Sequence, residues 1–523
     1  MPTIPTKVDA LRTIFRKNAD RSFLTDVATD RSFTYEELEQ ISLKLAAFLL
    51  ARGVVKGDRI AFILPNSAEH TFLFFACMHI GAIIVPINLR LRTEEIAVLL
   101  KEATPRVLFT TSVLQQKNAG MSGFVPGMQI ITIVPHSTTQ DVTGRDKNTG
   151  SIDIWKEVEK SIPSTVASFG AIRDEDVFAL VYTSGTTSRP KGVPIAYGKI
   201  IANAQTFIAA YNLPPGVSFL GTFSQGYLGG LYNTLLFQYV AQGSVILDAG
   251  FTTDVALRFW ETVQKYNVTA LWLVPSMLSI ILSLDRGTIG ETYAPRGLKF
   301  VFVGTAPLTP DLKTQFEVRY GVRLYENYAL SETLFLTANT PKLEVAKGCG
   351  RALPGCAVRI VDEQGRSCPP GTSGEIVVTS DYMASGYFKN PEETTRTFRD
   401  GLLYTGDVGY LTEDQSLIVT DRKKDIIIRG GINISPKEIE DVILRAVGVR
   451  EVAVVGIPHV LTGEEIVAVV VGDAALHAEQ LQTWCMEHLA PFKVPARILI
   501  HPELPRTASG KIQKNKVREL LTK

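Results

Sequence analysis

The sequence predicts an α/β protein: a large N-terminal domain of stacked α/β layers with a β-rich subdomain, followed by a small C-terminal α+β domain. Chain length is the first indication, because 523 residues exceed what a single hydrophobic core normally fills. Second, short apolar runs alternate with helical patterns over roughly the first 300 residues, which is typical of largely parallel sheets. Third, after about residue 355 the runs lie between turn signals, which indicates a β-rich unit.

Capping and periodicity predict the N-terminal elements. Thr34 and Glu37 match a capping box, and apolar side chains then recur at helical spacing from Leu38 to Phe48. The apolar stretch 71–87 is too short to span a bilayer comfortably, so we interpret it as a buried helix followed by a core strand. Strands are predicted at 59–64, 82–86, 107–110, 130–134, 177–182, 244–247, 269–274 and 298–303.

A domain boundary is predicted at the charged run Asp421-Arg422-Lys423-Lys424-Asp425. The large domain is assigned to residues 1–421 and the hinge to 422–424. Strand-like runs at 357–361, 374–379 and 417–420 form the β-rich part of the large domain.

The remaining residues, 425–523, are predicted to form the C-terminal domain. Ser435, Pro436 and Glu438 combine an N-cap, an N1 proline and a capping glutamate at the start of a helix. The runs 452–457 and 466–471 are strand-like.

Composition excludes several classes of protein. The net charge is +1, from 54 basic and 53 acidic side chains, so nothing electrostatic indicates a nucleic acid or an anionic membrane as partner. Five scattered cysteines form no C-x-x-C pair, and the seven histidines match no zinc motif. We therefore expect a reducing, cytoplasmic compartment without a disulfide framework, and any metal to be a hard cation held by oxygen. The first residues contain no signal-peptide apolar region.

The loop from Tyr182 to Gly192 is rich in hydroxyls, contains glycine and carries Lys191. It follows an apolar run, so its N–H groups, hydroxyls and ammonium can surround a polyphosphate. The G-x-x-x-x-G-K-[ST] spacing of the common phosphate loop is absent, and a solvated Ser/Thr turn is the alternative interpretation.

Four more motifs follow the loop in order. They are Asn327-Tyr328-Ala329-Leu330-Ser331-Glu332, Tyr404-Thr405-Gly406-Asp407, Asp421 to Asp425 with Arg429-Gly430-Gly431, and Ser509-Gly510-Lys511. Each alone has an ordinary explanation, since an aspartate after glycine is usually a turn residue and a charged run is usually a solvated face. The presence of all the motifs in this order is much more specific than any one motif alone.

Together these motifs resemble those of the adenylate-forming superfamily, nearest the acyl-CoA synthetase branch, over roughly residues 30–515. The segment from Gly386 to Glu392 adds to this resemblance. It implies that a carboxylate attacks the α-phosphate of ATP, giving an acyl-adenylate and pyrophosphate, and that coenzyme A then displaces AMP. The implied substrates and cofactors are ATP, Mg²⁺, coenzyme A and a small-molecule carboxylic acid.

The resemblance implies an ATP site with phosphate and metal ligands. Ser331 matches a hydroxyl near the α-phosphate, and Glu332 matches the Mg²⁺ ligand. The implied β/γ-phosphate cradle is Thr183, Ser184, Gly185, Thr186 and Thr187, with Lys191 beside it.

The rest of the nucleotide site is implied by the same resemblance. Tyr328, after Asn327, matches the residue that stacks on adenine. Asp407 matches the ribose-binding carboxylate, and Arg422 matches a second ribose contact. A loop that contains Gly304, Thr305 and Ala306 resembles the other wall of the adenine and acyl pocket.

Lys511 resembles a lysine on a mobile C-terminal domain that bridges the substrate carboxylate and the α-phosphate. Lys424 matches the pivot about which that domain rotates. Gly430 and Gly431 match the walls of the pantetheine tunnel, where the lack of a Cβ permits close approach.

Several residues depart from the family pattern. Ser188, Ala329 and Thr305 stand where glycine is usual, Tyr227 and Tyr197 stand where histidine is common, and Ile428 stands at a position that is often basic. Tyr227, Gly229, Gly230 and Thr305 are assigned to the acyl pocket, and Tyr227 and Tyr232 hint at an aromatic or medium-sized pocket. No acidic residue lies between Gly221 and Tyr239, which disfavours an α-amino acid as substrate.

Alternatives remain open. An adenylating enzyme could load an acyl-carrier protein instead of coenzyme A, although no insertion is evident after Lys424. A catalytically silent nucleotide sensor is a second alternative, which the presence of Lys511 disfavours. An oxygenase of luciferase type has no feature in its favour. The sequence identifies neither the acid nor the oligomeric state.

Overall fold

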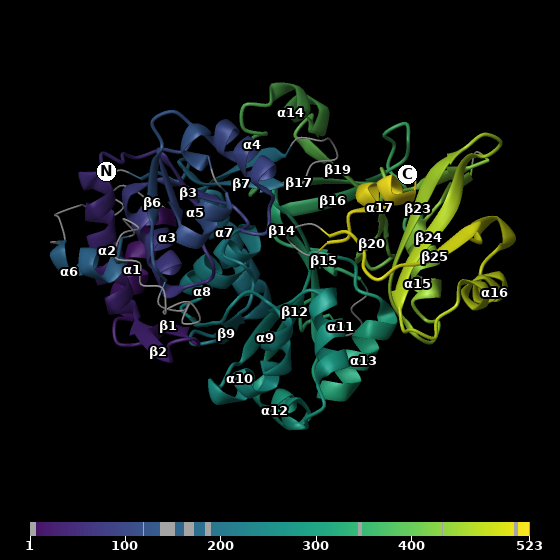
Figure 1. The fold of residues 1–523 in the computed structure, drawn as a ribbon, viewed down its shortest axis with the longest axis horizontal. Helices are drawn as coiled ribbons and strands as arrows, with labels where there is room; N and C mark the ends of the chain where they lie inside the picture. The colour runs from purple at the N-terminus through teal and green to yellow at the C-terminus, as the bar shows by residue number, and fades with distance from the viewer. Residues whose placement is uncertain are drawn as a thin grey trace.

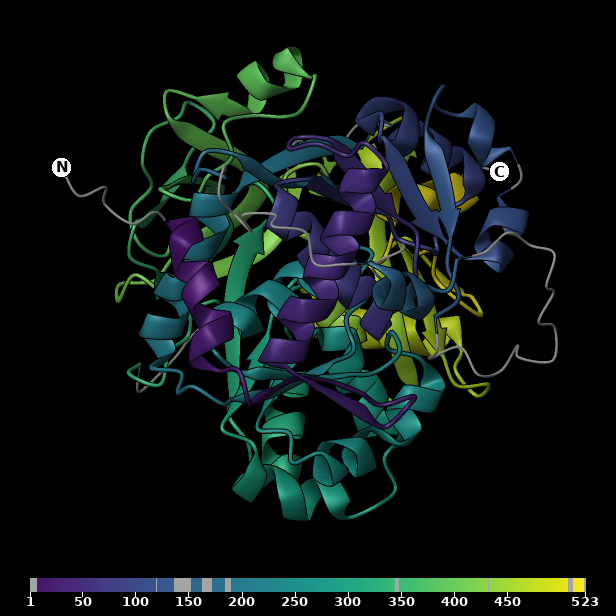
Figure 2. The same ribbon diagram turned by 90° about the vertical axis from the view of Figure 1, so that its left-hand side faces the viewer.

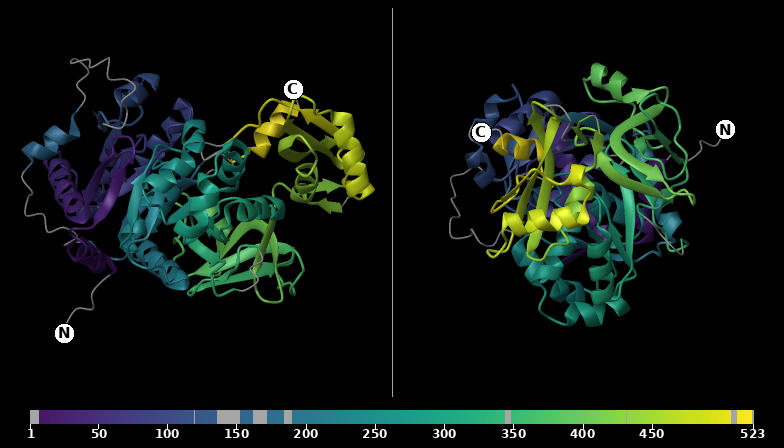
Figure 3. Two further views of the ribbon diagram at one scale, coloured as in Figure 1. Left: turned by 90° about the horizontal axis from the view of Figure 1, so that it is seen from below. Right: turned by 90° about the vertical axis from the view of Figure 1, so that its right-hand side faces the viewer.

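A computed structural model describes residues 7–118, 120–135, 152–161, 172–183, 190–343, 348–430, 432–506 and 511–521. It has a large N-terminal domain built on three sheets and a smaller C-terminal domain with a fourth (Figure 1). The C-terminal domain projects from one end of the large domain (Figure 3, left).

The first sheet has six strands, and five of them are parallel. Its order is β6 (Gln129–Thr132), β5 (Val107–Thr110), β3 (Arg59–Phe62), β4 (Ile83–Pro86), β7 (Val177–Thr183) and β8 (Lys191–Ala196). Only β8 is antiparallel, to β7. The five parallel strands confirm the runs predicted in this region. The sequence did not predict β8, whose pairing makes the hydroxyl-rich loop the tip of a hairpin.

The second sheet has nine strands with a parallel centre. Its order is β15 (Arg351–Ala352), β14 (Leu334–Ala338), β13 (Leu324–Leu330), β12 (Phe300–Val303), β11 (Ala270–Leu273), β9 (Ser218–Gly221), β10 (Ser244–Leu247), β1 (Ser22–Asp26) and β2 (Arg31–Thr34). Strands β2, β14 and β15 pair antiparallel at the edges. The predicted strands β10, β11 and β12 are confirmed.

Helices cover and separate these sheets. In the large domain they are α1 (Lys7–Lys17), α2 (Tyr35–Ala51), α3 (Ala68–Ile80), α4 (Thr93–Ala103), α5 (Ser112–Lys117), α6 (Ile154–Lys160), α7 (Tyr197–Tyr211), α8 (Phe237–Val240), α9 (Thr253–Leu257), α10 (Phe259–Lys265), α11 (Pro275–Leu284), α12 (Ile289–Gly297), α13 (Pro310–Tyr320) and α14 (Pro391–Thr397). The purple N-terminal helices lie in front of the sheets in Figure 2. The predicted capping box of α2 is present, because Thr34 Oγ1 accepts from the N–H of Glu37 and the Glu37 carboxylate accepts from the N–H of Thr34.

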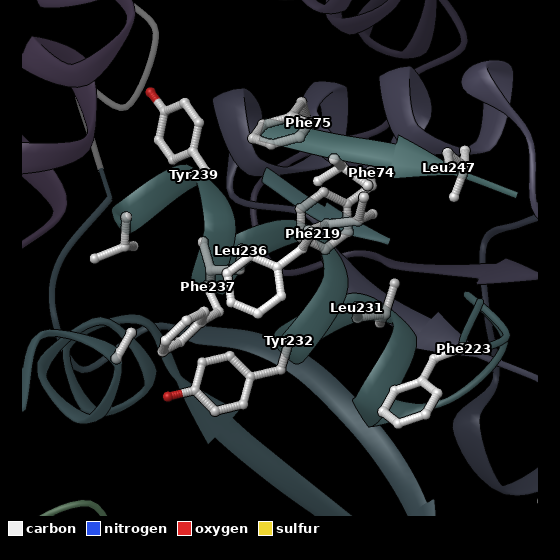
Figure 4. Packing of buried hydrophobic residues seen from close by; sticks show 14 of the residues in the cluster. Phe74, Phe75, Phe219, Phe223, Leu231, Tyr232, Leu236, Phe237, Tyr239 and Leu247 are labelled. Atoms are coloured by element: carbon white, nitrogen blue, oxygen red, sulfur yellow. The ribbon is translucent and has the colours of Figure 1, made fainter. Parts of the chain in front are cut away.

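One aromatic core joins the first two sheets. All residues of α3 are buried, as expected for the stretch 71–87, which continues into β4. Aromatic side chains of α3, β9 and α8 pack together there, among them Phe75, Phe219, Phe237 and Tyr239 (Figure 4). Within the described residues, no helix is long and apolar enough to cross a membrane.

The β-rich part of the large domain is a five-stranded antiparallel sheet. It contains β16 (Cys356–Val361), β17 (Gly374–Ser380), β19 (Leu402–Leu411), β18 (Phe398–Arg399) and β20 (Leu417–Arg422). The ordinary explanation of Asp407 as a turn residue after glycine does not hold. Asp407 lies inside β19, directly opposite Arg422 on β20, and the preceding Gly406 takes φ +70°, a conformation that suits glycine.

The C-terminal domain contains β21 (Ile427–Arg429), β22 (Ile432–Ile434), α15 (Pro436–Ile443), β23 (Val449–His459), β24 (Gly463–Gly472), α16 (Ala478–His488), β25 (Arg497–Ile500) and α17 (Lys514–Leu521). Ser435 caps α15 by accepting from the N–H of Glu438 at 3.1 Å, and Pro436 is its first residue, as predicted. The two predicted strands are β23 and β24. A separate apolar core lies between this sheet and helices α15 and α16.

Candidate active site

The phosphate-loop hairpin places Thr183 and Lys191 opposite each other. Thr183 ends β7, Lys191 begins β8, and the two residues pair in the antiparallel register. Ser184, Gly185, Thr186, Thr187 and Ser188 lie outside the described residues. The part of the loop that the structure describes therefore brings one hydroxyl and one ammonium to the same end of the hairpin.

The Lys191 side chain is buried and forms an ion pair with Glu393 on α14. Its Nζ lies 5.0 Å from the ring centroid of Tyr387. The N–H of Phe388 donates to the carbonyl of Gly192 at 2.8 Å, so the segment before α14 also binds the backbone of β8. Residues far apart in the sequence thus hold Lys191 in one orientation.

Glu332 lies on the turn between β13 and β14, next to Ser331, and is only partly buried. The Tyr387 hydroxyl donates to Glu332 Oε1 at 2.9 Å, and the N–H of Ala384 donates to the Glu332 carbonyl at 2.7 Å. Because an ionised carboxylate offers about four acceptor sites, this contact leaves Glu332 able to bind a cation.

Tyr328, Asp407 and Arg422 form a connected polar group in the large domain. The Tyr328 hydroxyl donates to Asp407 Oδ2 at 2.6 Å, and Arg422 Nε lies 2.9 Å from Asp407 Oδ1. Asp407 is only 3% exposed, whereas Arg422 is exposed. Burial and the neighbouring negative charge of Asp407 raise the pKa of Tyr328, so its hydroxyl stays protonated and donates.

The loop after β12 carries the assigned residues Gly304, Thr305 and Ala306. Asn327 on β13 supports it, because its Nδ2 donates to the carbonyl of Val303 at 3.1 Å. Thr305 and Ala306 are exposed. Thr305 adopts φ +69°, where a β-branched residue is an outlier. The departure from glycine at this position therefore places backbone strain beside the predicted pocket.

Thr305→Gly is expected to raise the thermal unfolding midpoint, because glycine adopts this backbone conformation without strain, which is worth about 1 kcal/mol. Differential scanning calorimetry measures the shift. Thr288→Gly is the matched control: Thr288 is also exposed, but its φ is −113°, so there the change should lower the midpoint. Equal destabilisation by both substitutions would contradict the strain at Thr305.

Tyr227 and the glycines around it lie at the start of a π-helix, η3 (Gly229–Leu236). Tyr227 packs against Phe223 with ring centroids 6.0 Å apart. A Cβ on Gly229 would lie 2.6 Å from the Tyr227 ring, and a Cβ on Gly230 would lie 1.9 Å from the Ser224 carbonyl oxygen. Close packing therefore explains why both positions are glycine and carry no Cβ.

Two tyrosines noted in the sequence belong to the core instead. Tyr197 is fully buried in α7, against Phe178. Tyr232 is 2% exposed, and its hydroxyl donates to Asn203 Oδ1 at 2.7 Å. Tyr232 is therefore part of the hydrophobic core.

The predicted hinge is a tight turn between β20 and β21. The N–H of Asp425 donates to the carbonyl of Arg422 at 2.8 Å, and the Lys424 side chain between them is exposed. Just before the turn, the buried Asp421 accepts from the Ser435 hydroxyl and from the N–H of Lys437, so it binds the N-terminus of α15 across the turn. Burial raises the pKa of Asp421 to about 6.

Lys511 lies where the two domains meet. Gly430, at φ +60°, and the exposed Ile428 lie in the same C-terminal domain; Gly431 is outside the described residues. Lys511 remains exposed to solvent, yet protein atoms surround it. Their desolvating effect and the positive charge of Arg422 lower the pKa of Lys511 to about 8, against the opposing charges of Asp407 and Glu332. Asp407 and Glu332 belong to the large domain, and Arg422 is the last residue of β20, where the predicted hinge begins.

The charged side chains described above suit a nucleotide that binds together with a hard cation such as Mg²⁺. Among the described residues no group of three or more histidine, cysteine or carboxylate side chains gathers into a metal site. Glu332 offers one carboxylate ligand, and Mg²⁺ that binds with a nucleotide usually takes its other ligands from phosphate and water oxygens. All five cysteines are free thiols.

Sequence reasoning missed three residues of this site: Tyr387, Glu393 and Asp421. Tyr387 belongs to the segment from Gly386 to Glu392, which resembles the family but gave no role to any side chain, and Glu393 directly follows that segment. Asp421 was taken as part of a charged run. Only the folded chain brings these side chains to Glu332, Lys191 and Ser435.

This arrangement defines a two-domain α/β protein in which charged side chains of both domains meet, as expected of a nucleotide-dependent ligase. The chain belongs to the AMP-binding enzyme family. The model of that family matches residues 11–388, and the model of the AMP-binding enzyme C-terminal domain matches residues 438–511.

Curated relatives include CoA ligases that act on dissimilar acids. The chain is 29% identical to a sulfoacetate–CoA ligase of Cupriavidus necator over 532 residues, covering 98% of both proteins. It is 30% identical to a long-chain-fatty-acid–CoA ligase of Bacillus subtilis over 514 residues, covering 94% of this chain and 90% of the relative.

Solved structures agree with the fold. ATP-bound MatB from Rhodopseudomonas palustris superposes with a TM-score of 0.87 at 28% identity, covering 98% of each chain. The o-succinylbenzoate CoA synthetase MenE from Bacillus subtilis, in complex with ATP and magnesium ion, superposes with a TM-score of 0.83 at 26% identity, covering 97% of this chain and 98% of that one.

Proposed function

We propose that this protein is an AMP-forming acid–CoA ligase. It activates a carboxylic acid with ATP to an acyl-adenylate, releasing pyrophosphate, and transfers the acyl group to coenzyme A. Curated relatives that are CoA ligases match nearly the whole chain, which supports this proposal. The observation that carries the proposal is the approach of Lys511 to Arg422, Asp407 and Glu332. A lysine from one domain beside a nucleotide site of the other is what carboxylate adenylation requires.

The first half-reaction brings two anions together, and charged groups of this chain offset their repulsion. Lys511 holds the carboxylate oxygen against the α-phosphate. Lys191 binds the β- and γ-phosphates, which leave as pyrophosphate. Glu332 holds Mg²⁺, which neutralises phosphate charge when bound. Arg422 adds positive charge beside Lys511 and orients Asp407 through their ion pair.

Asp407 and Tyr328 hold the nucleoside. We propose that the Asp407 carboxylate accepts from the ribose hydroxyls and that the Tyr328 ring stacks on adenine. The loop at Gly304, Thr305 and Ala306, supported by Asn327, forms the opposite wall. Ser331 lies beside Glu332, and its hydroxyl binds near the α-phosphate.

The second half-reaction requires Lys511 to leave. We propose that residues 425–523 rotate about Lys424, within the hinge 422–424 that follows the domain 1–421. Rotation withdraws Lys511 and brings Gly430 and Gly431 to the thiol path. The contact of Asp421 with α15 crosses this turn and must rearrange for the domain to rotate.

The pH dependence of adenylation is expected to report Lys511. The ammonium is the active form, and its pKa of about 8 means that it is lost as pH rises through 8, whereas an ordinary lysine keeps its proton to about 10. The kcat/KM for ATP at saturating acid should therefore fall above pH 8. Lys511→Arg should move that fall to higher pH, and a wild-type profile that stays flat to pH 10 would contradict the assignment.

Pyrophosphate exchange into ATP, measured across a panel of carboxylic acids, tests the proposed function. Exchange with at least one acid, followed by AMP release that depends on coenzyme A, is expected. Exchange without turnover of coenzyme A would favour an acyl-carrier protein as acceptor, and no exchange with any acid would favour a nucleotide sensor. The five free cysteines support a cytoplasmic location as part of this proposal.

A further inference from the structure

We propose that Glu393 is a positioning residue that holds Lys191 in the empty enzyme and releases it to the terminal phosphates when ATP binds. This inference rests on one part of the proposed function, namely that Lys191 binds the phosphates of ATP. It assigns a role to an ion pair between β8 and α14 that phosphate binding by itself does not explain.

The ion pair lies out of water. The Lys191 and Glu393 side chains are 10% and 11% exposed, and the Tyr387 ring covers the ammonium at 5.0 Å. Removing a lysine ammonium from water is unfavourable unless an anion is close, so Lys191 needs a carboxylate whenever no phosphate is present. Glu393 supplies it.

Glu393 has other partners that keep its charge balanced after Lys191 leaves. Arg396 Nη2, one turn along α14, lies 2.7 Å from Glu393 Oε2, and the Thr397 hydroxyl donates to Oε1 at 3.2 Å. Although partial burial opposes ionisation, the hydrogen bonds from Arg396 and Lys191 hold the pKa of Glu393 below its ordinary value. Arg396 and Thr397 stay beside the Glu393 carboxylate when Lys191 leaves it, which is what a reversible exchange of partners requires.

The same segment connects this exchange to the metal ligand. The Tyr387 hydroxyl binds Glu332 Oε1 at 2.9 Å while the Tyr387 ring faces Lys191. One aromatic side chain thus contacts both groups, the ammonium over its ring and the Glu332 carboxylate at its hydroxyl. Phosphate oxygens that reach Glu332 through a cation come close to Lys191, where they compete with Glu393 by charge.

Two substitutions test this exchange because they should change ATP affinity in opposite directions. In Glu393→Gln, Lys191 loses its charged competitor, so ATP should bind about three- to tenfold more tightly. In Arg396→Gln, Glu393 depends more on Lys191, so ATP should bind more weakly by a similar factor. Isothermal titration calorimetry with MgATP, without acid or coenzyme A, measures both.

Charge-matched controls separate exchange from long-range attraction. Glu392→Gln removes the same charge from the exposed neighbour of Glu393, and Arg399→Gln removes the charge of an exposed arginine just beyond Arg396. Each control substitution should change the affinity for MgATP much less than Glu393→Gln or Arg396→Gln does. A second measurement is thermal unfolding: Glu393→Gln should lower the midpoint of the empty protein and enlarge the increase caused by ATP.

The outcomes are distinguishable. Weaker ATP binding in both Glu393→Gln and Arg396→Gln would mean that the ion pair is only structural, which overturns the inference. Effects no larger than those of the controls would also overturn it. Failure of the wild-type protein to bind MgATP would instead contradict the proposed function itself.

Discussion

Lys511→Ala is expected to slow acyl-adenylate formation by about 10²–10³-fold, the effect of losing one preorganised charge of about 3–4 kcal/mol at the transition state. Lys511 is the residue of the C-terminal domain whose charge acts together with Arg422, Asp407 and Glu332. Pyrophosphate exchange measures the loss. Because the lysine is withdrawn for the second half-reaction, thioester formation from a synthetic acyl-adenylate should change by less than about tenfold.

Lys516→Ala is the matched control, since Lys516 lies on α17 only a few residues further along. It should retain near-normal exchange. If Lys511→Ala also retained near-normal exchange, the assignment of Lys511 would be wrong. If both half-reactions fell equally, Lys511 would act on the fold of the domain and not on the first half-reaction.

Asp407→Ala is expected to weaken ATP binding by about 3 kcal/mol, or more than 100-fold, because hydrogen bonds to a charged acceptor are worth about 1.5–3 kcal/mol each. The change also removes the partner of Arg422 Nε and of the Tyr328 hydroxyl, at 2.9 and 2.6 Å. Calorimetric titration with MgATP measures the affinity. Tyr328→Phe keeps the ring and loses only the hydroxyl, so it should have a much smaller effect.

The control for folding is Asp414→Ala. Asp414 lies on the turn between β19 and β20, where it pairs with Arg351 at 3.2 Å. This substitution perturbs the same hairpin and should leave ATP affinity unchanged. An affinity of Asp407→Ala equal to that of Asp414→Ala would contradict the ribose-binding role.

Elements with a strong local signal were predictable from the sequence. The capping box at Thr34 and the Ser435-Pro436 helix start are local patterns, and both are present. Most apolar parallel strands of the two large sheets were predictable for the same reason, because strands buried on both faces are continuously apolar. The parallel strands β1, β9 and β13 were not predicted. Strand β8 was not, since it begins with the charged residue Lys191 inside a glycine- and proline-containing loop.

Residues of the candidate site were predictable where a motif carries them, and their contacts were not. Asp407 was recognised from Thr-Gly-Asp, but its place in a strand depends on pairing with β17 and β20. The Lys191–Glu393 ion pair joins residues that are 202 positions apart. No local pattern encodes such a pairing, because the connection exists only once α14 packs beside β8.

The central claim is that a substrate carboxylate oxygen attacks the α-phosphate of ATP. Transfer of oxygen-18 tests it most directly, using an accepted acid labelled in both carboxylate oxygens, with ATP and coenzyme A. The account predicts AMP whose phosphate carries one labelled oxygen, together with unlabelled pyrophosphate. Unlabelled AMP, or ADP with labelled inorganic phosphate, would contradict it.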